Sequence, residues 1–487
     1  MSEALYDIDA LRTIESRAGA GNDLMERAGQ AAWRALLEHW PDARRIAVVC
    51  GPGNNGGDGD ALAWLAHASG RDVVLVRDGQ HTPRSHEACA MHARMQATGV
   101  TVHSDSSVIE GCDVVVDAVL GIGLARAPDN DITRSINSIN ATRAPVLSLD
   151  VPSGVDASCG SVFEGAVCAT RTIEFIAPKA GLRTGAARAH VGVLQLADLG
   201  LDAAMFAGIK PMACKLDARD LARWLAPRGL DSHKGVHGRV LCIGGDIGHG
   251  GAILLAAEAA LRSGAGLVDI ETRGRHVTAA LARLPESMPH ATHGSDAVRQ
   301  RIGQATTCVL GPGLGQGAWG ALRFDACIAH ATQLVLDADA LNLLASRRVA
   351  LPTSTILTPH PGEAARLIGC TTADVQRNRF DAAAHIADAY DAVVVLKGAG
   401  TLVAAPGEVA QLIDAGNPGM AVGGMGDVLA GVIGALRAQG LRAFDAACAG
   451  ALLHSVAGDA AAADGQRGML PQDLMPHLRR LANPVLQ

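Results

Sequence analysis

Residues 417–431 read NPGMAVGGMGDVLAG, and this stretch decides how the rest of the chain is interpreted. Five of its fifteen residues are glycine, and an apolar helical pattern begins at Val428. Glycines ahead of a helix let backbone N–H groups approach an anion, and the helix N-terminus adds a positive dipole end. Asp427 falls in the first turn, where a carboxylate can take a proton from a hydroxyl attacking phosphorus. An ordinary tight turn with a capping Asp has the same composition.

The composition is that of a large packed chain. Its 487 residues favour two or three domains, and 48% hydrophobic with 19% charged residues favours packed cores. A net charge of −7 and 3% aromatic residues argue against nucleic-acid or membrane partners. The eleven cysteines show neither zinc spacing nor a disulfide framework. With no signal-peptide pattern and no uninterrupted apolar run of spanning length, the sequence predicts a cytoplasmic chain.

The first half begins with a helical pattern over 10–37, followed by an apolar strand at 45–50. The strand leads directly into GPGNNGGDG at 51–59, and a helical pattern covers 60–68. A strand, a glycine-rich turn and a helix place phosphates or a dinucleotide at the helix N-terminus. The spacing matches neither G-x-G-x-x-G nor a P-loop, so neither binding mode is implied. A structural loop of turn-forming residues is the alternative.

Further strands are predicted at 73–76, 113–117 and 146–150, with helical patterns between them. Strands that alternate with helices predict a parallel, doubly wound sheet. Asp117 and Asp150 each close a strand, at the sheet edge where ligands bind. Either Asp alone could simply cap a turn, but together with the Asn-rich loop they favour a site.

The segments LMERAG, GPGNNGGDG, VVDAVLGIG, SLDVPSGVD and TIEFIAPKAGL resemble, in this order, the NAD(P)H-hydrate epimerase family. The resemblance covers roughly residues 10–205 and implies a Rossmann-like domain, which we place at 1–210. It also implies a potassium ion held by Asn55, Asp117 and Ser153, whose oxygens suit a hard cation. The substrate contacts that it implies are Asn54, Asn55, Gly56, Gly57, Asp58, Gly121, Ile122, Gly123, Leu124, Ala125, Arg126, Ala127 and Asp150.

Epimerisation at C6 of the hydrated nicotinamide requires proton transfer. Asp150 and Lys179 are the available acid and base candidates on the resembling segments. Lys179 could equally contact a phosphate or be a solvated lysine.

The second half repeats the pattern of strands and polar loops. A charged, strand-poor stretch at 206–233 places the domain boundary near residue 210. Strands are then predicted to end in polar loops that form the rim of a second doubly wound sheet: 246–252, 311–315, 337–342, 358–363 and 397–401. His360 is fixed between two prolines, which suits a ligand contact with no metal role, and Lys397 suits a phosphate. An exposed loop histidine and a surface lysine are the alternatives.

The motifs HKG…GRVLCIGG, GPGLG, LDADALN, LTPHPGE, LKGAGT and GNPGMAVGGMGDVLAG are similar to those of the ribokinase-like NAD(P)H-hydrate dehydratase family. This resemblance spans about 215–483 and implies a ribokinase-like domain at 211–487. The predicted fold class is therefore α/β, with two doubly wound domains. The implied contacts to the hydrated dinucleotide are Ala252, Gly313 or Gly315, His360 and Asp427; those to the adenine nucleotide are Lys397, Gly398, Ala399, Gly400, Thr401 and Gly426. Fused members of the family use ADP, so we expect ADP, although spacing does not separate ADP from ATP.

The expected dehydratase chemistry starts when Asp427 takes the proton of the C6 hydroxyl as that oxygen attacks the β-phosphorus of ADP. Phosphate then leaves, and NADH or NADPH forms again beside AMP. We expect Mg²⁺ on the phosphates, although no carboxylate pair identifies its ligands. The rivals are a small-molecule kinase for a vitamin precursor or sugar, and a regulatory module whose first domain senses nucleotides. The chain could form a homo-oligomer, and the sequence does not separate NADH hydrate from NADPH hydrate as the substrate.

Overall fold

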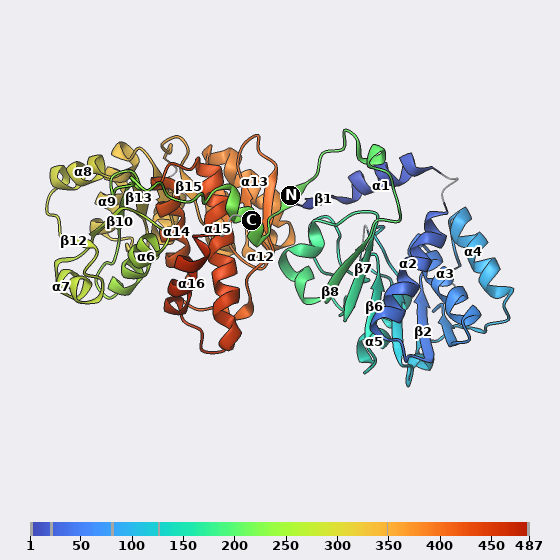
Figure 1. Cartoon of the computed structure of the whole chain (residues 1–487). Helices are drawn as coiled ribbons and strands as arrows, with labels where there is room; N and C mark the ends of the chain where they lie inside the picture. The colour runs from blue at the N-terminus through green and yellow to red at the C-terminus, as the bar shows by residue number, and fades with distance from the viewer. Residues whose placement is uncertain (1–2, 20–22, 79–81, 125–126, 348, 485–487) are drawn as a thin grey trace. The chain divides into compact units, whose positions relative to one another are not determined.

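The computed structural model describes residues 3–19, 23–78, 82–124, 127–347 and 349–484. The chain divides into two compact units between Ala213 and Cys214, and Glu3 belongs to the C-terminal unit. Both units are α/β, which confirms the predicted fold class (Figure 1).

The N-terminal unit is built on a seven-stranded sheet in the order β4-β3-β2-β5-β6-β7-β8, and every neighbouring pair is parallel. Its strands are β2 (Arg45–Cys50), β3 (Asp72–Val76), β4 (Val102–His103), β5 (Val114–Ala118), β6 (Val146–Leu149), β7 (Arg171–Phe175) and β8 (Val193–Ala197). In the register of the central strand β2, Val48 pairs with Leu75 on one side and Val116 on the other. These strands are apolar runs because both faces of the sheet are covered.

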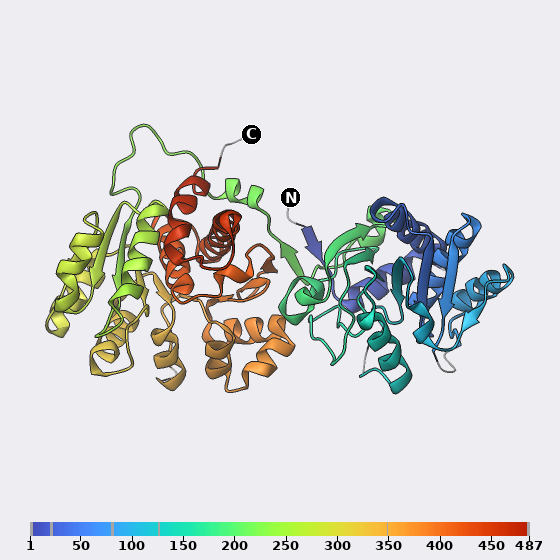
Figure 2. The same cartoon turned by 90° about the horizontal axis from the view of Figure 1, so that it is seen from below.

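Helices cover the two faces of this sheet, the blue helices on one and α5 on the other (Figure 2). The α-helices are α1 (Ile8–Ala18), α2 (Leu24–His39), α3 (Asn54–Ala68), α4 (His86–Gln96) and α5 (Asn130–Ala141). Short 3-10 helices occur at Ser106–Ile109, Gly181–Arg183, Gly185–Ala189 and Ala203–Phe206. One core lies between α2, α3 and the sheet, and a second lies under α5. Successive residues of β2 point to opposite faces of the sheet: Ile46 and Val48 belong to the first core, and Ala47 and Val49 belong to the second.

Two local predictions for this half were wrong. The single helix expected over 10–37 is two helices, α1 and α2; α1 ends where Gly19 adopts a φ of 75°. The glycine-rich segment is also not a turn throughout, because α3 begins at Asn54. Its glycines serve close packing: a Cβ at Gly56 would lie 2.0 Å from the Gly51 carbonyl oxygen, and one at Gly59 would lie 2.6 Å from Ala118 Cβ.

The second sheet has eleven strands in the order β1-β9-β18-β17-β16-β15-β14-β13-β10-β11-β12, and all of them from β10 to β18 lie in the C-terminal unit. Neighbours from β16 through to β12 are parallel, whereas β16-β17 and β17-β18 are antiparallel. The strands are β1 (Glu3–Leu5), β9 (Ala213–Lys215), β10 (Arg239–Ile243), β11 (Leu267–Glu271), β12 (Met288–His290), β13 (Thr307–Leu310), β14 (Leu334–Leu336), β15 (Ile356–Leu357), β16 (Val393–Leu396), β17 (Thr401–Ala404) and β18 (Ala410–Ile413).

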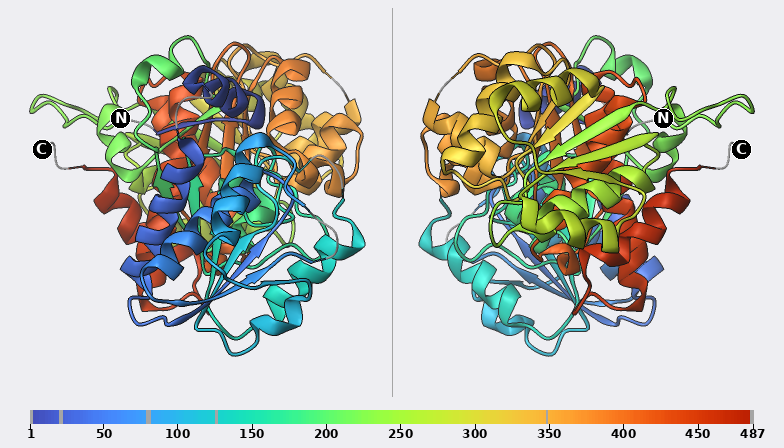
Figure 3. Two further views of the ribbon diagram at one scale, coloured as in Figure 1. Left: turned by 90° about the vertical axis from the view of Figure 1, so that its right-hand side faces the viewer. Right: turned by 90° about the vertical axis from the view of Figure 1, so that its left-hand side faces the viewer.

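Two layers of helices enclose this sheet, the red helices on one side and the gold to orange helices on the other (Figure 2); Figure 3 shows the yellow-green strands between them. The α-helices are α6 (Gly250–Arg262), α7 (Gly274–Arg283), α8 (Ser295–Gln304), α9 (Ala318–His330), α10 (Asp339–Arg347), α11 (Pro361–Ile368), α12 (Thr372–Arg377), α13 (Arg379–Tyr390), α14 (Met425–Ala438), α15 (Ala443–Ala461) and α16 (Leu474–Leu481). The 3-10 helices are Ala218–Arg223, Pro418–Met420, Ala462–Asp464 and Pro471–Asp473.

Helix α14 is the most buried element of this layer. It packs on α6 and α15, and Gly431 allows the contact because a Cβ there would lie 2.1 Å from the Ala256 carbonyl oxygen. The neighbouring segment Ala443–Asp464 is long and apolar enough to span a membrane by length and composition. Because 72% of that window is buried inside the protein, a core helix explains its apolar character.

Strand order fixes where a ligand can bind in each unit. In the N-terminal sheet the chain adds strands on one side from β2 to β4, then returns to the middle and adds strands on the other side from β5 to β8. The C-terminal sheet changes direction in the same way between β10 and β13. A crevice forms at such a switch point, beyond the carboxyl ends of the two strands. After β10 and β13 the two loops are joined by hydrogen bonds, since Gly245 N donates to Pro312 O and Asp246 N donates to Gly313 O.

Candidate active sites

The N-terminal unit has a cavity of about 1110 Å³ beyond the carboxyl ends of β2, β5 and β6. It is larger than most single-metabolite pockets, as a dinucleotide requires. The predicted contacts that line it are Asn54, Asn55, Asp58, Gly121, Ile122, Gly123 and Asp150. The start of α3 and the loop after β5 therefore meet at one site.

Asp150 lines this cavity and forms an ion pair with Lys179, which is buried and does not line the cavity itself. Lys179 Nζ lies 2.7 Å from Asp150 Oδ1, and the lysine side chain is only 1% exposed. The ammonium also donates to the carbonyl oxygens of Phe175 (2.8 Å) and Ala177 (3.3 Å). Asp150 has a φ of 65°, a conformation that costs free energy in a residue with a side chain and is concentrated at functional sites. The carboxylate is thus held in place by its charge partner and by an unusual backbone.

Two more carboxyl groups face the same cavity. Burial, followed by the charge of Asp150, raises the pKa of Glu15, although Lys179 opposes the shift. Burial and then the charges of Asp150 and Glu15 raise the pKa of Asp58 well above its usual value. Burial and mutual repulsion therefore both disfavour the charged forms of Glu15 and Asp58. Sequence reasoning missed Glu15, which no glycine-rich motif marks.

The residues predicted to hold potassium lie next to this cavity. Asp117 is fully buried and accepts from Ser153 Oγ (2.5 Å), Ser153 N (2.9 Å) and Ser148 Oγ (2.8 Å). Burial raises its pKa, which these hydrogen bonds oppose. The Asn55 side chain is 7% exposed, and neither its oxygen nor its nitrogen has a protein partner. Because buried amides are normally hydrogen-bonded, an unpaired one fits a ligand or a cation.

The other predicted contacts of the first unit are placed differently. Gly56 and Gly57 do not line the cavity: they pack inside α3 against the Gly51 backbone and the Met25 side chain. Leu124 is buried and Ala127 is exposed. Ala125 and Arg126 lie outside the described residues.

In the C-terminal unit, Asp427 lies in the first turn of α14, as the sequence predicted. Lys397 directly follows β16, and its Nζ lies 2.6 Å from Asp337 Oδ1 and 3.8 Å from Glu363 Oε2. A Cβ at Gly426 would lie 3.1 Å from Lys397 Nζ, so the glycine lets α14 start against the ammonium group. Burial alone would lower the pKa of Lys397, but Asp337 and Glu363 outweigh it and raise the pKa.

Asp427 is the one half-buried carboxyl in this cluster whose pKa moves into the neutral range. Its pKa is raised to about 7, by burial first and then by the charge of Asp337, with Lys397 opposing. Asp339 and Glu363 add to the shift. A carboxylate with a pKa near 7 is a stronger base than an ordinary aspartate and is still deprotonated in half of the molecules at that pH.

His360 caps the N-terminus of α11. Its Nδ1 accepts from Gly362 N (3.0 Å) and Glu363 N (3.3 Å), so the ring is neutral and carries its proton on Nε2. Burial, followed by the charges of Lys397 and Arg366, lowers the pKa of His360. The ring is about half exposed, and its Nε2 lies 3.4 Å from Glu363 Oε1, so a ligand that accepts this N–H would share it with the carboxylate.

Arg379 holds the predicted nucleotide-binding loop in place through hydrogen bonds to backbone carbonyl groups. It is 1% exposed, and its Nη2 donates to the carbonyl oxygens of Leu396, Lys397 and Gly400. Burial lowers its pKa to about 10, so it remains a cation. The loop 397–400 includes Gly398 (φ 136°), whose Cβ position would lie 3.1 Å from the guanidinium. Thr401 Oγ1 donates to Gly398 O (3.2 Å), and Ala399 is exposed.

The remaining predicted contacts gather at the β10/β13 switch point. A Cβ at Gly313 would lie 3.2 Å from Ala252 Cβ, which places the loop after β13 on the first turn of α6. Gly315 N donates to Asp339 Oδ2 (2.8 Å). Asp339 therefore links this loop to the charged cluster around Asp427.

Sequence reasoning missed four charged residues of this second site: Asp337, Asp339, Glu363 and Arg379. The first three lie within quoted motifs, LDADALN and TPHPGE, at strand ends where polar side chains converge. Arg379 opens α13, and nothing in its local sequence marks it as the support of a loop eighteen or more residues away.

The fold and the two clusters define a two-domain α/β enzyme that acts on nucleotides. Residues 240–480 match the family model of NAD(P)H-hydrate dehydratase, and residues 21–181 match that of the YjeF-related protein N-terminus. The chain is 44% identical to the bifunctional NAD(P)H-hydrate repair enzyme of Escherichia coli, over 95% of this chain and 90% of that protein. It is also 44% identical to the enzyme of the same name from Coxiella burnetii, over 99% of each. A solved ribokinase-like superfamily protein from Enterococcus faecalis matches 55% of the chain and 96% of its own, with 30% identity and a TM-score of 0.51.

The chain belongs to the family of bifunctional NAD(P)H-hydrate repair enzymes. Its N-terminal half is the epimerase and its C-terminal half the dehydratase. The resemblances read from the sequence are confirmed, and a relative that matches both halves argues against a plain small-molecule kinase.

Proposed function

We propose that the two units act in sequence on hydrated NADH and NADPH. The unit within 1–210 interconverts the R and S hydrates, and the unit within 211–487 dehydrates the S hydrate with ADP, giving NAD(P)H, AMP and phosphate. The observation that carries this proposal is Asp427, with its raised pKa, at the start of α14 beside Lys397. The two α/β units place one site each beyond the carboxyl ends of their strands.

In the epimerase unit, we assign proton transfer to Asp150 and Lys179. Leaving and return of the C6 hydroxyl need a donor and an acceptor of protons; Asp150 lines the cavity, and buried Lys179 is its ion-pair partner. Asn54, Asn55, Asp58 and residues 121–123 line the cavity and would hold the dinucleotide.

Potassium is the cation that we assign to Asn55, Asp117 and Ser153. The donors fit: the Asn55 oxygen is buried without a partner, and Asp117 and Ser153 offer further oxygens. When bound, the ion would supply positive charge to the dinucleotide phosphates or ring. The proton-transfer groups themselves belong to the chain.

In the dehydratase unit, Asp427 takes the proton of the C6 hydroxyl while that oxygen attacks the β-phosphorus of ADP and AMP departs. The C6–O bond then breaks as the ring nitrogen lone pair forms a C6=N1 iminium, and the oxygen leaves with phosphate. Loss of a proton from C5 to water then gives the C5=C6 double bond of NAD(P)H. Lys397 supplies a fixed positive charge near the phosphates, and backbone N–H groups of 423–427 face the developing charge. Phosphorylation is needed because hydroxide is a poor leaving group. His360 can donate from Nε2 to the hydrated dinucleotide.

The residues of this site fit Mg²⁺ as an ion that is bound mainly through the ADP phosphates. Among the described residues no group of three or more His, Cys, Asp or Glu could hold a metal ion. Magnesium bound through phosphates needs only one or two carboxylates, and Asp337 and Asp339 are the nearest candidates. The ion would neutralise phosphate charge.

We also propose a cytoplasmic location. All eleven cysteines lie in the described residues and none forms a disulfide, which fits a reducing compartment.

The test of the function follows absorbance at 340 nm as NAD(P)H forms from a mixture of R and S hydrates with ADP. We expect the intact chain to convert the whole mixture at one continuous rate. A variant disabled in the N-terminal cavity by Asp150→Asn should convert the S share rapidly and then slow to the spontaneous epimerisation rate. Full rapid conversion by that variant would contradict the epimerase assignment, and no conversion by the intact chain would contradict the function.

The pH profile of the dehydratase should have an acid limb set by Asp427. Because its pKa is raised to about 7, kcat/KM for the S hydrate should fall about tenfold for each pH unit below that value, as the base becomes protonated. Asp339→Asn removes a charge that raises this pKa, so its acid limb should lie at lower pH. A limb with the same midpoint in wild type and Asp339→Asn, or one near pH 4 in wild type, would show that another group controls the rate.

A further inference from the structure

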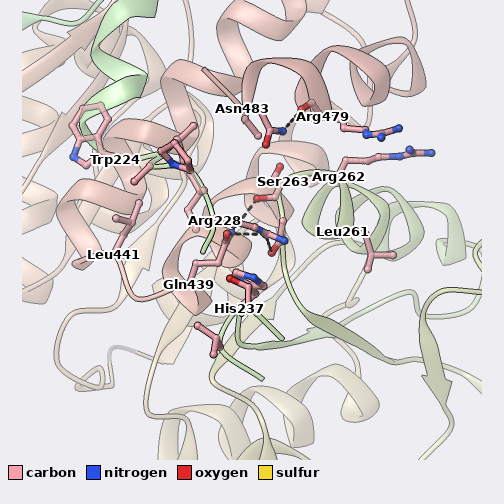
Figure 4. Close-up of a pocket in the computed structure, with 18 of the residues that line it drawn as sticks. Trp224, Arg228, His237, Leu261, Arg262, Ser263, Gln439, Leu441, Arg479 and Asn483 are labelled. Atoms are coloured by element: carbon pink, nitrogen blue, oxygen red, sulfur yellow. Dashed lines mark hydrogen bonds between the residues drawn. The ribbon is translucent and has the colours of Figure 1, made fainter. Parts of the chain in front are cut away.

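The C-terminal unit has a second cavity at the opposite edge of its sheet from Asp427. Its volume is about 640 Å³, within the range of small-molecule pockets (Figure 4). It lies where β10 and β11 begin, between the loop 224–237 and the carboxyl ends of α6, α14 and α16. None of the predicted contacts to the hydrate or to ADP lines it.

Two helices run from the active site to this cavity. Helix α6 begins beside Ala252 and ends at the cap residue Ser263; helix α14 carries Asp427 at its start and ends at the cap residue Gln439. Ser263 and Gln439 both line the cavity, and Gln439 Nε2 donates to Ser263 O (3.0 Å). This hydrogen bond joins the carboxyl ends of α6 and α14 at the cavity wall.

Arginines dominate the charge of the cavity. Arg228, Arg262 and Arg479 line it, and among the described residues neither Arg228 nor Arg479 forms an ion pair with a carboxylate. The two acidic lining residues are Glu258 and Glu286, and Glu258 is already bound by Arg283 at 2.8 Å. This wall is therefore positive within a chain whose net charge is −7.

Helix dipoles explain only part of this arrangement. Arg262 and Arg479 fall in the last turns of α6 and α16, where a cation is favourable. Arg228 is on a loop, and its Nη2 reaches Gly264 O (2.5 Å) and Gln439 Oε1 (3.2 Å), which holds the guanidinium inside the cavity. Burial and then the charge of Arg228 lower the pKa of His237.

A buried hydroxyl in the wall has no partner. Ser263 is 3% exposed, and its Oγ forms no hydrogen bond, although buried hydroxyls are normally paired. The wall also includes apolar residues, among them Trp224, Leu261, Leu284 and Leu441. The cavity thus combines guanidinium groups and a free hydroxyl with an apolar surface.

We propose that this cavity is a second ligand site of the C-terminal unit, for a small organic oxyanion whose charged group binds the arginine guanidinium groups of the lining and whose apolar part packs on Trp224 and the leucines. Guanidinium groups bind phosphate or carboxylate through paired N–H donors. The proposal concerns a site remote from the hydrate and ADP, and it stands or falls separately from the catalytic assignments.

The test is calorimetric titration of phenyl phosphate into the full chain, with phenol, inorganic phosphate and benzoate as comparison probes. We expect phenyl phosphate to bind more tightly than phenol or inorganic phosphate, because it satisfies both parts of the cavity. The double variant Arg228→Gln/Arg479→Gln should weaken it at least about tenfold. The matched control Arg377→Gln/Arg442→Gln loses the same charge at exposed ion pairs and should change nothing. Dehydratase activity of both variants should stay near wild type, which shows that they fold.

The relative affinities for phenyl phosphate and benzoate show whether the site prefers a phosphate or a carboxylate. Tighter binding of phenyl phosphate than of benzoate assigns the site to organic phosphates, and the reverse order assigns it to carboxylates. Equal affinity of phenyl phosphate and phenol, or equal loss of binding in the control variant, would overturn the proposal.

Discussion

Asp427→Asn should lower kcat of the dehydratase by about 10²–10⁴-fold, the usual contribution of a positioned general base. The amide has the same shape as the carboxyl group but cannot take the hydroxyl proton. The substitution leaves the proposed ADP contacts, Lys397 and the 397–401 loop, unchanged, so ADP affinity should stay within about threefold. Steady-state rates at 340 nm and ADP titration measure the two quantities.

The matched control for this variant is Asp296→Asn, an exposed aspartate on α8 that pairs only with Arg299. It should leave kcat and ADP affinity at wild-type values. An Asp427→Asn enzyme that retains more than about a third of wild-type kcat would remove Asp427 from the role of base.

Lys179→Met should abolish epimerisation and destabilise the N-terminal unit. Methionine fills a similar volume but leaves the Asp150 carboxylate, which is 13% exposed, without its charge partner. Breaking a buried ion pair from one side costs about 3–5 kcal/mol in the free energy of unfolding. The R-to-S conversion rate should fall about 10²–10⁴-fold. Denaturant unfolding and the 340 nm assay with purified R hydrate measure these effects.

The double variant Lys179→Met/Asp150→Asn separates folding from chemistry. It removes the unpaired charge and should recover most of the lost stability, whereas epimerisation should stay absent. Dehydration of the S hydrate by the same chain serves as an internal control for correct folding of the C-terminal unit. Recovery of epimerisation in the double variant would mean that the pair only stabilises the fold.

Much of the fold could be predicted because strand and helix patterns are local. The apolar runs at Arg45–Cys50 and Val393–Leu396 and the start of α14 are visible in the sequence. Glycines were harder to interpret. Those at 56, 57 and 59 serve helix packing, and for Gly57 and Gly59 this depends on Met25 and Ala118, which are distant in sequence.

The charged surroundings of the sites depend on long-range contacts in the same way. Asp427 was predicted from its place in a helix turn, but its raised pKa comes from burial and from Asp337, ninety residues earlier. From the sequence, Lys179 could be an acid or base, a phosphate contact or a solvated lysine. Only the fold places its Nζ 2.7 Å from Asp150 Oδ1. Electrostatics of this kind are set by tertiary structure, so motifs identify the residues without revealing their protonation.

The central claim is that the C6 hydroxyl, deprotonated by Asp427, becomes an oxygen of the released phosphate. The most direct test uses S hydrate labelled with ¹⁸O at the C6 hydroxyl and unlabelled ADP, with ³¹P NMR of the products. The mechanism predicts one ¹⁸O atom in each inorganic phosphate, none in AMP and none in water. Label recovered in water, with unlabelled phosphate, would show that the hydroxyl departs without attacking phosphorus and would contradict the account.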